Sequence, residues 1–405
     1  MFQNVGRELP FILLLLALLG FRWRVRPRAS VYIHAPIQKV FDLIDFREGD
    51  NQRWQRTRVT CKRTDAPGEV YRLTFVTALT TGAVQSSNAL FEVVQRDAPW
   101  HFEVRRAGLE GKSDNSELLR MTSRLSPEGN GTRLRIAYEW GPRPLLAQIL
   151  ARADLWGSAY RIKGLAETGL PDYRTDAVIS ACMAAITGIV SLWAFAFAFG
   201  WGIAFLLVAA LLVHEFGHLL AYRLIGQPWG RMVFLPFLGA VAVPRLGFVS
   251  QAQSVFAAIM GPAVSVAIPL AAAVYLLIWP VGIGADMALS FGLVAAALNL
   301  FNLLPVEPLD GGIILRSVAA RLLGRRARFG LIAAGLAIMF CGWYSQQILL
   351  LIFGALAVTM NIRTRKIDTG LEPLSRLQVV ISAFGFMSVV AAYAVLTRFF
   401  LASLT

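Results

Sequence analysis

The sequence predicts a polytopic α-helical membrane protein of about eight spans that carries an inserted soluble α+β domain. Three observations support this class. The chain of 405 residues is 56% hydrophobic with a mean hydropathy of +0.56, and only 16% of its residues are charged. Apolar segments of bilayer-spanning length recur from residue 176 to residue 405. Residues 28–170 instead alternate polar and apolar positions, as half-buried strands do.

The first element is a short apolar segment from Leu9 to Phe21. A cleavable signal peptide carries positive charge before its apolar run and a small-residue cleavage site after it. Here the charge follows the run, at Arg22, Arg24, Arg26 and Arg28. We therefore expect residues 1–27 to form an uncleaved membrane anchor whose basic end lies at the cytoplasmic interface.

Residues 28–170 predict a compact α+β domain. Val31 to Ala35 is typical of a strand, and Pro36 begins a short helix. A long helix from Pro144 to Glu167 ends the domain. Between them lie six alternating segments, separated by breaks that contain proline or glycine. These segments are Thr57–Arg63, Val70–Thr80, Asn88–Gln95, Trp100–Arg106, Glu117–Leu125 and Thr132–Trp140.

This order of elements resembles the START/polyketide-cyclase-like superfamily of helix-grip domains. The similarity rests on the opening segment from Val31 to Ile44, on Trp54, and on the closing segment from Leu155 to Glu167. The resemblance implies a sheet wrapped around the last helix, with an apolar ligand between them. A cavity-free domain that docks a regulatory protein is an equally weighted alternative, since fold does not fix function. His34 and His101 are expected to be packed or surface residues.

The remainder, residues 176–405, predicts the membrane domain. We thread the apolar segments through the bilayer in alternating directions, starting from a cytoplasmic Arg174. This threading places every arginine and lysine between Asp176 and Asp368 at a cytoplasmic end of a segment. The threading therefore predicts a multi-pass membrane protein with residues 28–170 in the cytoplasm, and we expect the membrane to be a bacterial cytoplasmic membrane. The apolar segments are Ala177–Phe199, Ile203–Ile225, Ser254–Trp279, Ala288–Leu304, Phe329–Tyr344, Ile348–Met360 and Leu377–Leu396.

Charge and cysteine usage exclude two other classes. The net charge of +14 comes from 39 Lys and Arg against 25 Asp and Glu. Because the bases gather at the ends of apolar segments, the excess indicates membrane topology and no nucleic-acid partner. Cys61, Cys182 and Cys341 are scattered and form no CxxC pair, so neither a disulfide framework nor a thiolate zinc site is predicted.

A metal-binding motif lies inside one apolar segment. His214-Glu215-Phe216-Gly217-His218 places two imidazoles four residues apart on one helical face, where both can bind one ion. The Glu215 carboxylate would then lie beside a water on that ion. An unpaired carboxylate in an apolar helix is costly, which favours a functional site over two structural histidines.

Two imidazoles do not complete a catalytic zinc site, which takes three protein ligands and water. Asp310 is the candidate third ligand. It lies in the segment Asn299-Leu-Phe-Asn-Leu-Leu-Pro-Val-Glu-Pro-Leu-Asp-Gly-Gly312, after a membrane segment that reaches the same cytoplasmic side as His214 and His218. Taken alone, Asp310 is as well explained by a helix N-cap on the segment Gly311 to Leu323.

Together the two motifs resemble the site-2 protease family of intramembrane zinc metalloproteases. The resemblance implies that His214, His218 and Asp310 bind Zn²⁺ and that Glu215 is the general base. It implies that Asn302 orients or stabilises the oxyanion, although a hydrogen bond between helices is an alternative role for this residue.

The segment from Phe234 to Pro244 resembles the membrane-dipping β-loop of the same family. The resemblance implies that Phe234, Gly239 and Val241 contact an extended substrate. The expected substrate is a single-span membrane protein in the lipid bilayer, cleaved within or near its transmembrane helix, with the helix-grip domain regulating access. A membrane-anchored sensor of a lipid or apolar ligand, in which the membrane part is a scaffold, is the alternative.

Overall fold

The structure is a computed structural model that describes residues 24, 26–54, 57–78, 84–107, 118–142, 145–170, 172–237, 239–245, 247–307, 309–346, 348–363 and 371–404. The chain divides into two compact units, one from Phe2 to Met183 and one from Ala184 to Thr405. Each unit is described by itself. The anchor predicted over residues 1–27 lies almost entirely outside the described residues.

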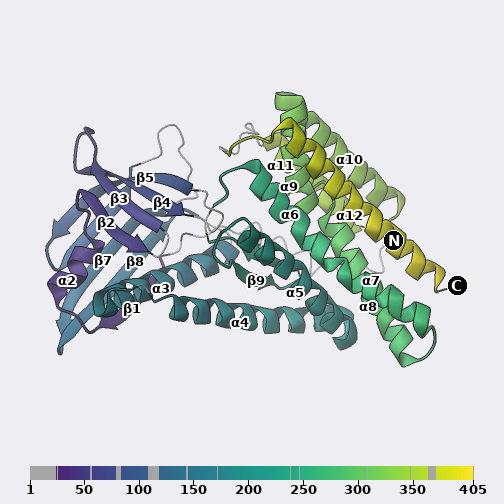
Figure 1. The fold of residues 1–405 in the computed structure, drawn as a ribbon, viewed down its shortest axis with the longest axis horizontal. Coiled ribbons are helices and arrows are strands. Elements are labelled where there is room, and N and C mark those ends of the chain that lie inside the picture. The colour runs from purple at the N-terminus through teal and green to yellow at the C-terminus, as the bar shows by residue number, and fades with distance from the viewer. Residues whose placement is uncertain are drawn as a thin grey trace. The chain divides into compact units, whose positions relative to one another are not determined.

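The first unit is built on an eight-stranded antiparallel sheet (Figure 1). The strands follow the order β1-β8-β7-β6-β5-β4-β3-β2, so each strand after β1 pairs with its neighbour in the chain and β1 closes onto β8. The helices are α2 (Ile37–Ile44) and α3 (Leu145–Thr168). The strands are β1 (Arg28–Ile33), β2 (Gly49–Trp54), β3 (Thr57–Arg63), β4 (Val70–Ala78), β5 (Val84–Asp97), β6 (His101–Arg106), β7 (Leu118–Glu128) and β8 (Gly131–Trp140).

Alternation along the strands determines which face of this sheet is covered. In β1 the side chains of Val31 and Ile33 are buried, and in β8 those of Leu134 and Ile136 are buried. They form one core with residues of α2 and with Leu155 of α3. The two helices therefore pack on the same face of the sheet, which agrees with the predicted α+β domain and its closing helix.

The sequence analysis missed one strand, β2. Its segment Gly-Asp-Asn-Gln-Arg-Trp has no apolar alternation, because β2 is an edge strand that pairs only with β3. An edge strand needs no continuous apolar face, so its sequence carries little periodic signal.

The second unit consists of apolar helices. Six helical segments of the described chain are long and apolar enough to cross a membrane. A seventh helix, α11 (Ile348–Arg363), contains only the shorter apolar segment Leu350–Thr359. The total of eight spans therefore stays a prediction. The six segments are Ala177–Phe199 in α4 (Tyr173–Phe199), α5 (Trp201–Leu224), Gln251–Ile278 formed by α6 (Gln251–Ser265) and α7 (Ala267–Ile278), α8 (Ile283–Asn302), α10 (Ala327–Tyr344) and α12 (Arg376–Ala402).

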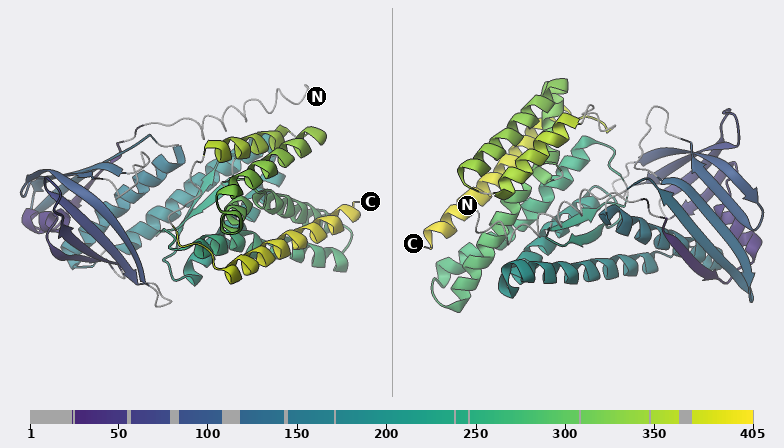
Figure 2. Two further views of the ribbon diagram at one scale, coloured as in Figure 1. Left: turned by 90° about the horizontal axis from the view of Figure 1, so that it is seen from above. Right: turned by 180° about the vertical axis from the view of Figure 1, so that it is seen from behind.

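Helix packing in this unit brings two distant parts of the chain together. Helix α5 packs on α6 and α8, and α9 (Asp310–Leu323) also packs on α6 (Figure 1). Helices α10 and α11 run side by side, and α12 lies along α6 and α8 (Figure 2). A small antiparallel hairpin of β9 (Arg231–Leu235) and β10 (Gly239–Val243) contacts α5 through β10.

Two glycines allow α5 and α6 to cross closely. A Cβ on Gly217 of α5 would lie 2.4 Å from the carbonyl oxygen of Met260 in α6. A Cβ on Gly261 would lie 2.4 Å from the Cε1 and Nε2 atoms of His218. Neither distance is sterically allowed, so only glycine lets α6 approach the histidine face of α5 this closely.

Candidate metal centre

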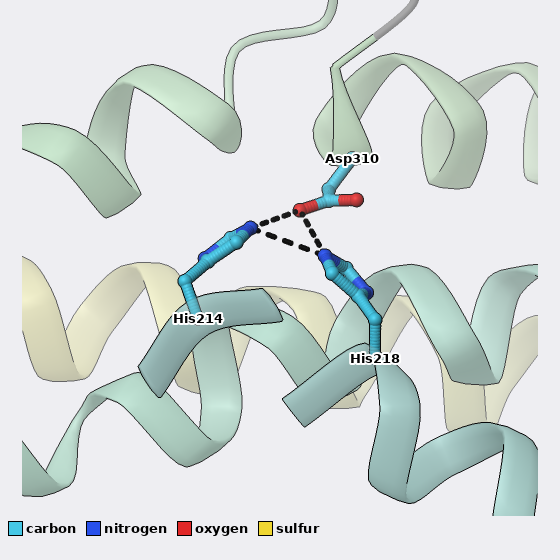
Figure 3. A group of neighbouring side chains, drawn as sticks. All are labelled: His214, His218 and Asp310. Atoms are coloured by element: carbon cyan, nitrogen blue, oxygen red, sulfur yellow. Dashed lines mark hydrogen bonds and ion pairs between the residues drawn. The ribbon is translucent and has the colours of Figure 1, made fainter. Parts of the chain in front are cut away.

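Three side chains from two helices converge on one point (Figure 3). His214 and His218 come from α5, and Asp310 is the first residue of α9. The Nε2 atoms of the histidines lie 3.1 Å apart, and Oδ2 of Asp310 lies 3.2 Å from His214 Nε2 and 3.4 Å from His218 Nε2. No other group of three potential ligands of this kind occurs among the described residues.

The hydrogen bonds behind the two rings determine which nitrogen carries a proton. His218 Nδ1 lies 2.7 Å from the carbonyl oxygen of Ala257, which can only accept, so Nδ1–H donates to it. His214 Nδ1 lies 2.8 Å from Oδ1 of Asn299, whose amide nitrogen donates to the carbonyl of Ala295. In the neutral imidazoles, both Nε2 atoms therefore present a lone pair to the Asp310 carboxylate.

This arrangement suits a divalent cation. With both imidazoles neutral, two nitrogen lone pairs and a carboxylate oxygen face one another, an arrangement that a positive charge among them stabilises. Zn²⁺ binds such atoms at about 2.0–2.1 Å, which sets tetrahedral ligands about 3.3 Å apart. The measured separations of 3.1–3.4 Å agree with that value. The three residues fit zinc in donor chemistry and spacing.

The surroundings of Asp310 bear on its two predicted roles. The residue before it, Leu309, is the N-cap of α9, and no side chain caps the helix there. The Asp310 carboxylate instead faces the two histidines. This geometry favours the role of ligand over that of helix cap.

The loop before Asp310 is held in place by close backbone packing. A Cβ on Gly311 would lie 2.1 Å from the carbonyl oxygen of Leu303, so the turn needs glycine at this position. Farther along α9, Arg316 forms an ion pair of 2.7 Å with Glu307 of the same loop. Both features fix where the first turn of α9 begins, and therefore where the carboxylate lies.

Glu215 is buried next to the three-residue group but is not one of its members. The backbone amide of Ala242 in β10 lies beside its carboxylate. Two turns along α5, the Tyr222 hydroxyl donates to the Ala242 carbonyl at 3.0 Å. These contacts attach the hairpin to α5, the helix that carries the histidines. The β10 strand is the edge of the hairpin that faces Glu215.

The residues predicted to contact substrate lie in this hairpin. Phe234 is buried against α4 and α5, and its backbone amide donates to Thr187 of α4 at 3.1 Å. Gly239, with a φ of +108°, begins β10, and Val241 pairs with Val233 of β9. Gly239 and Val241 are half-buried, whereas the Phe234 side chain is buried between the hairpin and helices α4 and α5. Contact of these residues with a substrate stays a prediction.

The sequence analysis missed Asn299. This residue is fully buried in α8 and is the only residue of that helix with a recorded hydrogen bond to a histidine of the described site. Asn302, the predicted oxyanion residue, lies one turn later at the half-buried end of α8. The spacing of two asparagines three residues apart in an apolar helix was a usable signal, because both then lie on one face.

We expect Asn299→Ala to weaken zinc binding by about 10- to 100-fold, because His214 then loses the partner that fixes its tautomer and ring orientation. Asn299→Asp keeps an acceptor for His214 Nδ1–H and should retain most of the affinity. Competition with a chelator of known zinc affinity measures both variants in detergent. Equal affinities for Asn299→Ala and the unchanged protein would show that the hydrogen bond has no positioning role.

Comparisons with known proteins agree with the motifs. The chain is 31% identical over 146 residues to a Synechocystis protein named "Putative zinc metalloprotease sll0528". The match covers 36% of this chain, and the chain spans 38% of the length of that relative. No protein-family model matches the chain.

Three solved structures are similar to parts of the chain. The site-2 protease from Methanocaldococcus jannaschii is 21% identical, with a TM-score of 0.31, over 45% of this chain and 87% of that one. The di-domain ARO/CYC protein BexL is 17% identical, with a TM-score of 0.27, over 36% and 49%. Protein CV1439 from Chromobacterium violaceum is 15% identical, with a TM-score of 0.27, over 35% and 96%. The similarity to metalloproteases that the sequence motifs predicted is therefore confirmed.

Proposed function

We propose that this protein is an intramembrane zinc metalloendopeptidase that hydrolyses a peptide bond within or near the transmembrane helix of a single-span membrane protein. One observation carries the proposal. Two imidazole lone pairs and a carboxylate converge within 3.1–3.4 Å inside apolar helices, next to the buried Glu215. A scaffold or ligand sensor needs neither this group nor the glycines that make room for it.

In the proposed mechanism His214, His218 and Asp310 hold zinc, which would supply Lewis acidity toward water and the scissile carbonyl. Glu215 accepts a proton from the attacking water and returns it to the leaving amine. The Ala242 amide orients the Glu215 carboxylate for this task. Asn302 is proposed to orient or stabilise the oxyanion from the end of α8.

Removing the metal tests the proposed activity. The purified full chain, reconstituted in vesicles with a single-span substrate, should cleave it, stop after treatment with a chelator, and recover when Zn²⁺ is added. Mg²⁺ should not restore cleavage, because imidazole ligands suit zinc and not magnesium. Cleavage that continues unchanged after complete removal of zinc would rule out the metalloprotease mechanism.

The outer edge of β10 is the proposed substrate-binding strand. The Phe234 amide points away from β10, to Thr187, so its partner Ala240 also directs its backbone amide away from β9. On this edge the Ala242 amide lies beside Glu215, and the Ala242 carbonyl accepts from Tyr222. No partner of the Ala240 amide is recorded in the described chain. An unwound substrate segment could form backbone hydrogen bonds with β10 at Ala240 and would then extend past the Glu215 carboxylate.

Ala240→Pro should therefore lower cleavage by about tenfold or more while zinc content stays unchanged. Proline removes one outward amide, and the ladder between β9 and β10 uses the neighbouring residues. Cleavage rate and zinc content are measured on the same preparation. If the variant cleaves at the original rate, the substrate does not pair with this edge.

We also propose a cytoplasmic orientation and a regulatory role for the sheet domain. Exposed Trp201, Trp279 and Trp343 lie at ends that the charge threading places outside, as interfacial aromatic residues do. Helix α3 ends at Thr168, and the first candidate span begins at Ala177, so only a short segment of chain joins the domain to the membrane part. Cleavage by the full chain and by a chain lacking residues 31–167 should differ in rate or selectivity, whereas zinc content should not.

A further inference from the structure

The sheet domain contains a basic cavity that the proposed protease mechanism does not use. Its volume is about 660 Å³, within the range of small-molecule sites. Arginines from three neighbouring strands, and one from the segment before β1, line it together with a single acidic residue. These lining residues are Arg26, Arg28 of β1, Arg120 and Arg124 of β7, Arg135 of β8 and the acidic Glu139 of β8.

Part of this charge is balanced within the domain. Arg26 forms an ion pair with Glu139 at 2.8 Å. Arg120 forms one with Glu103 of β6 at 3.3 Å. The remaining three arginines, Arg28, Arg124 and Arg135, are exposed, and no ion pair within 4 Å is recorded for them among the described residues. Arg135 interacts electrostatically with Glu128, which itself pairs with Arg133. The cavity therefore keeps an excess of positive charge that can attract an anion.

The strand register brings two of the unpaired arginines directly together. Arg124 of β7 lies opposite Arg135 of β8, and Arg28 of β1 pairs with Ala137, two residues along β8 from Arg135. Like charges opposite each other in a sheet are destabilising. Such a pair becomes favourable when an anion lies between the two guanidinium groups, because each can donate two hydrogen bonds to it.

The arginines line the cavity from the face of the strands opposite the core, whereas Ala29, Ile136 and Trp156 of α3 line its border with the interface between the sheet and α3. Residues adjacent to the arginines, such as Ala29, Leu125 and Ile136, point to the buried core under α3. Leu155 and other residues of α3 fill that interface. The arginine side chains, by alternation, extend from the other face of the strands.

The cavity also offers apolar surface. Ala137 of β8 and the partly exposed indole of Trp156 in α3 line it with the arginines. Apolar segments flank the domain in the sequence. Residues 9–21 precede it, and the candidate span that begins at Ala177 follows it. A ligand that combines a negative headgroup with an apolar body would suit both parts of this lining, and an anionic phospholipid is such a molecule.

We propose that this arginine cavity binds a phosphate group, and that its apolar wall favours the headgroup of an anionic phospholipid over a soluble phosphate. The guanidinium groups of Arg124 and Arg135 clasp the phosphate, Arg28 adds charge, and Trp156 packs against the apolar portion. This site is independent of the metal centre, so its existence does not depend on proteolysis.

The test titrates the full chain, in a neutral detergent, with dihexanoyl phosphatidylglycerol, dihexanoyl phosphatidylcholine or glycerol 3-phosphate, and counts bound molecules by native mass spectrometry. We expect phosphatidylglycerol to bind at least about tenfold more tightly than the zwitterionic lipid, and less tightly as salt is raised. If glycerol 3-phosphate displaces it at equal concentration, the phosphate site is supported and its source is a soluble ligand.

The double variant Arg124→Gln/Arg135→Gln should weaken this binding by about tenfold or more. The matched control is Arg47→Gln/Arg105→Gln, which removes the same charge from two exposed arginines of the same domain that do not line the cavity. Zinc content and elution volume verify that both variants fold. Equal binding of the two lipids, or equal losses in both double variants, would overturn the proposal.

Discussion

Glu215→Gln is expected to lower cleavage by at least about a hundredfold while zinc stays bound. Removing a general base typically costs 10²- to 10⁴-fold in rate, because glutamine cannot accept the proton of the attacking water. Glu215 lies outside the group of three ligands, and glutamine keeps an oxygen that can accept the Ala242 amide. The structure around the metal should therefore be preserved.

Two measurements on the same preparation check this variant: zinc per chain by inductively coupled plasma mass spectrometry, and cleavage of a transmembrane substrate in vesicles. Asp286→Asn serves as the control, because Asp286 is an exposed acid in the first turn of α8. The account of Glu215 is wrong if the variant cleaves at the original rate, or if it loses zinc to the same extent as activity.

Asp310→Ala is expected to remove most of the zinc, as His214→Ala should. Loss of one ligand of three opens the site and leaves two imidazoles. A role as helix cap would predict a different result, namely full zinc content and a loss of only about 1 kcal/mol in stability. The structure already favours the ligand role, because the cap position is Leu309.

The same control, Asp286→Asn, separates the two roles of Asp310. Both acids lie in the first turn of a helix, so both lose the same favourable interaction with the helix dipole when neutralised. Only Asp310→Ala should lose zinc. Similar zinc contents in the two variants, with similar small drops in melting temperature, would contradict the ligand assignment.

Local periodicity is the part of this site that the sequence could predict. Residues four apart on a helix share a face, so His214 and His218 predicted a common ligand position before any fold was known. The apolar flanks predicted that this helix is a membrane span, and the structure places the six candidate spans close to the predicted segments. Asp310 was predicted as a ligand only by its motif, since its distance from the histidines depends on the packing of α9.

What escaped prediction depends on contacts between distant segments. Asn299 orients His214 only because α8 packs against α5. Gly261 matters because its position faces His218 across a helix crossing. Likewise, the pairing of Arg124 with Arg135 follows from the register of β7 and β8. No local pattern in the sequence encodes these relations.

Zinc-edge X-ray absorption of the purified full chain tests the central claim most directly. It measures which atoms surround the metal and at what distance. The account predicts about four nitrogen or oxygen neighbours at roughly 2.0–2.1 Å, the multiple-scattering signal of two imidazoles, and no sulfur shell. A sulfur shell near 2.3 Å, or a protein that retains no zinc, would contradict a metal centre formed by His214, His218 and Asp310.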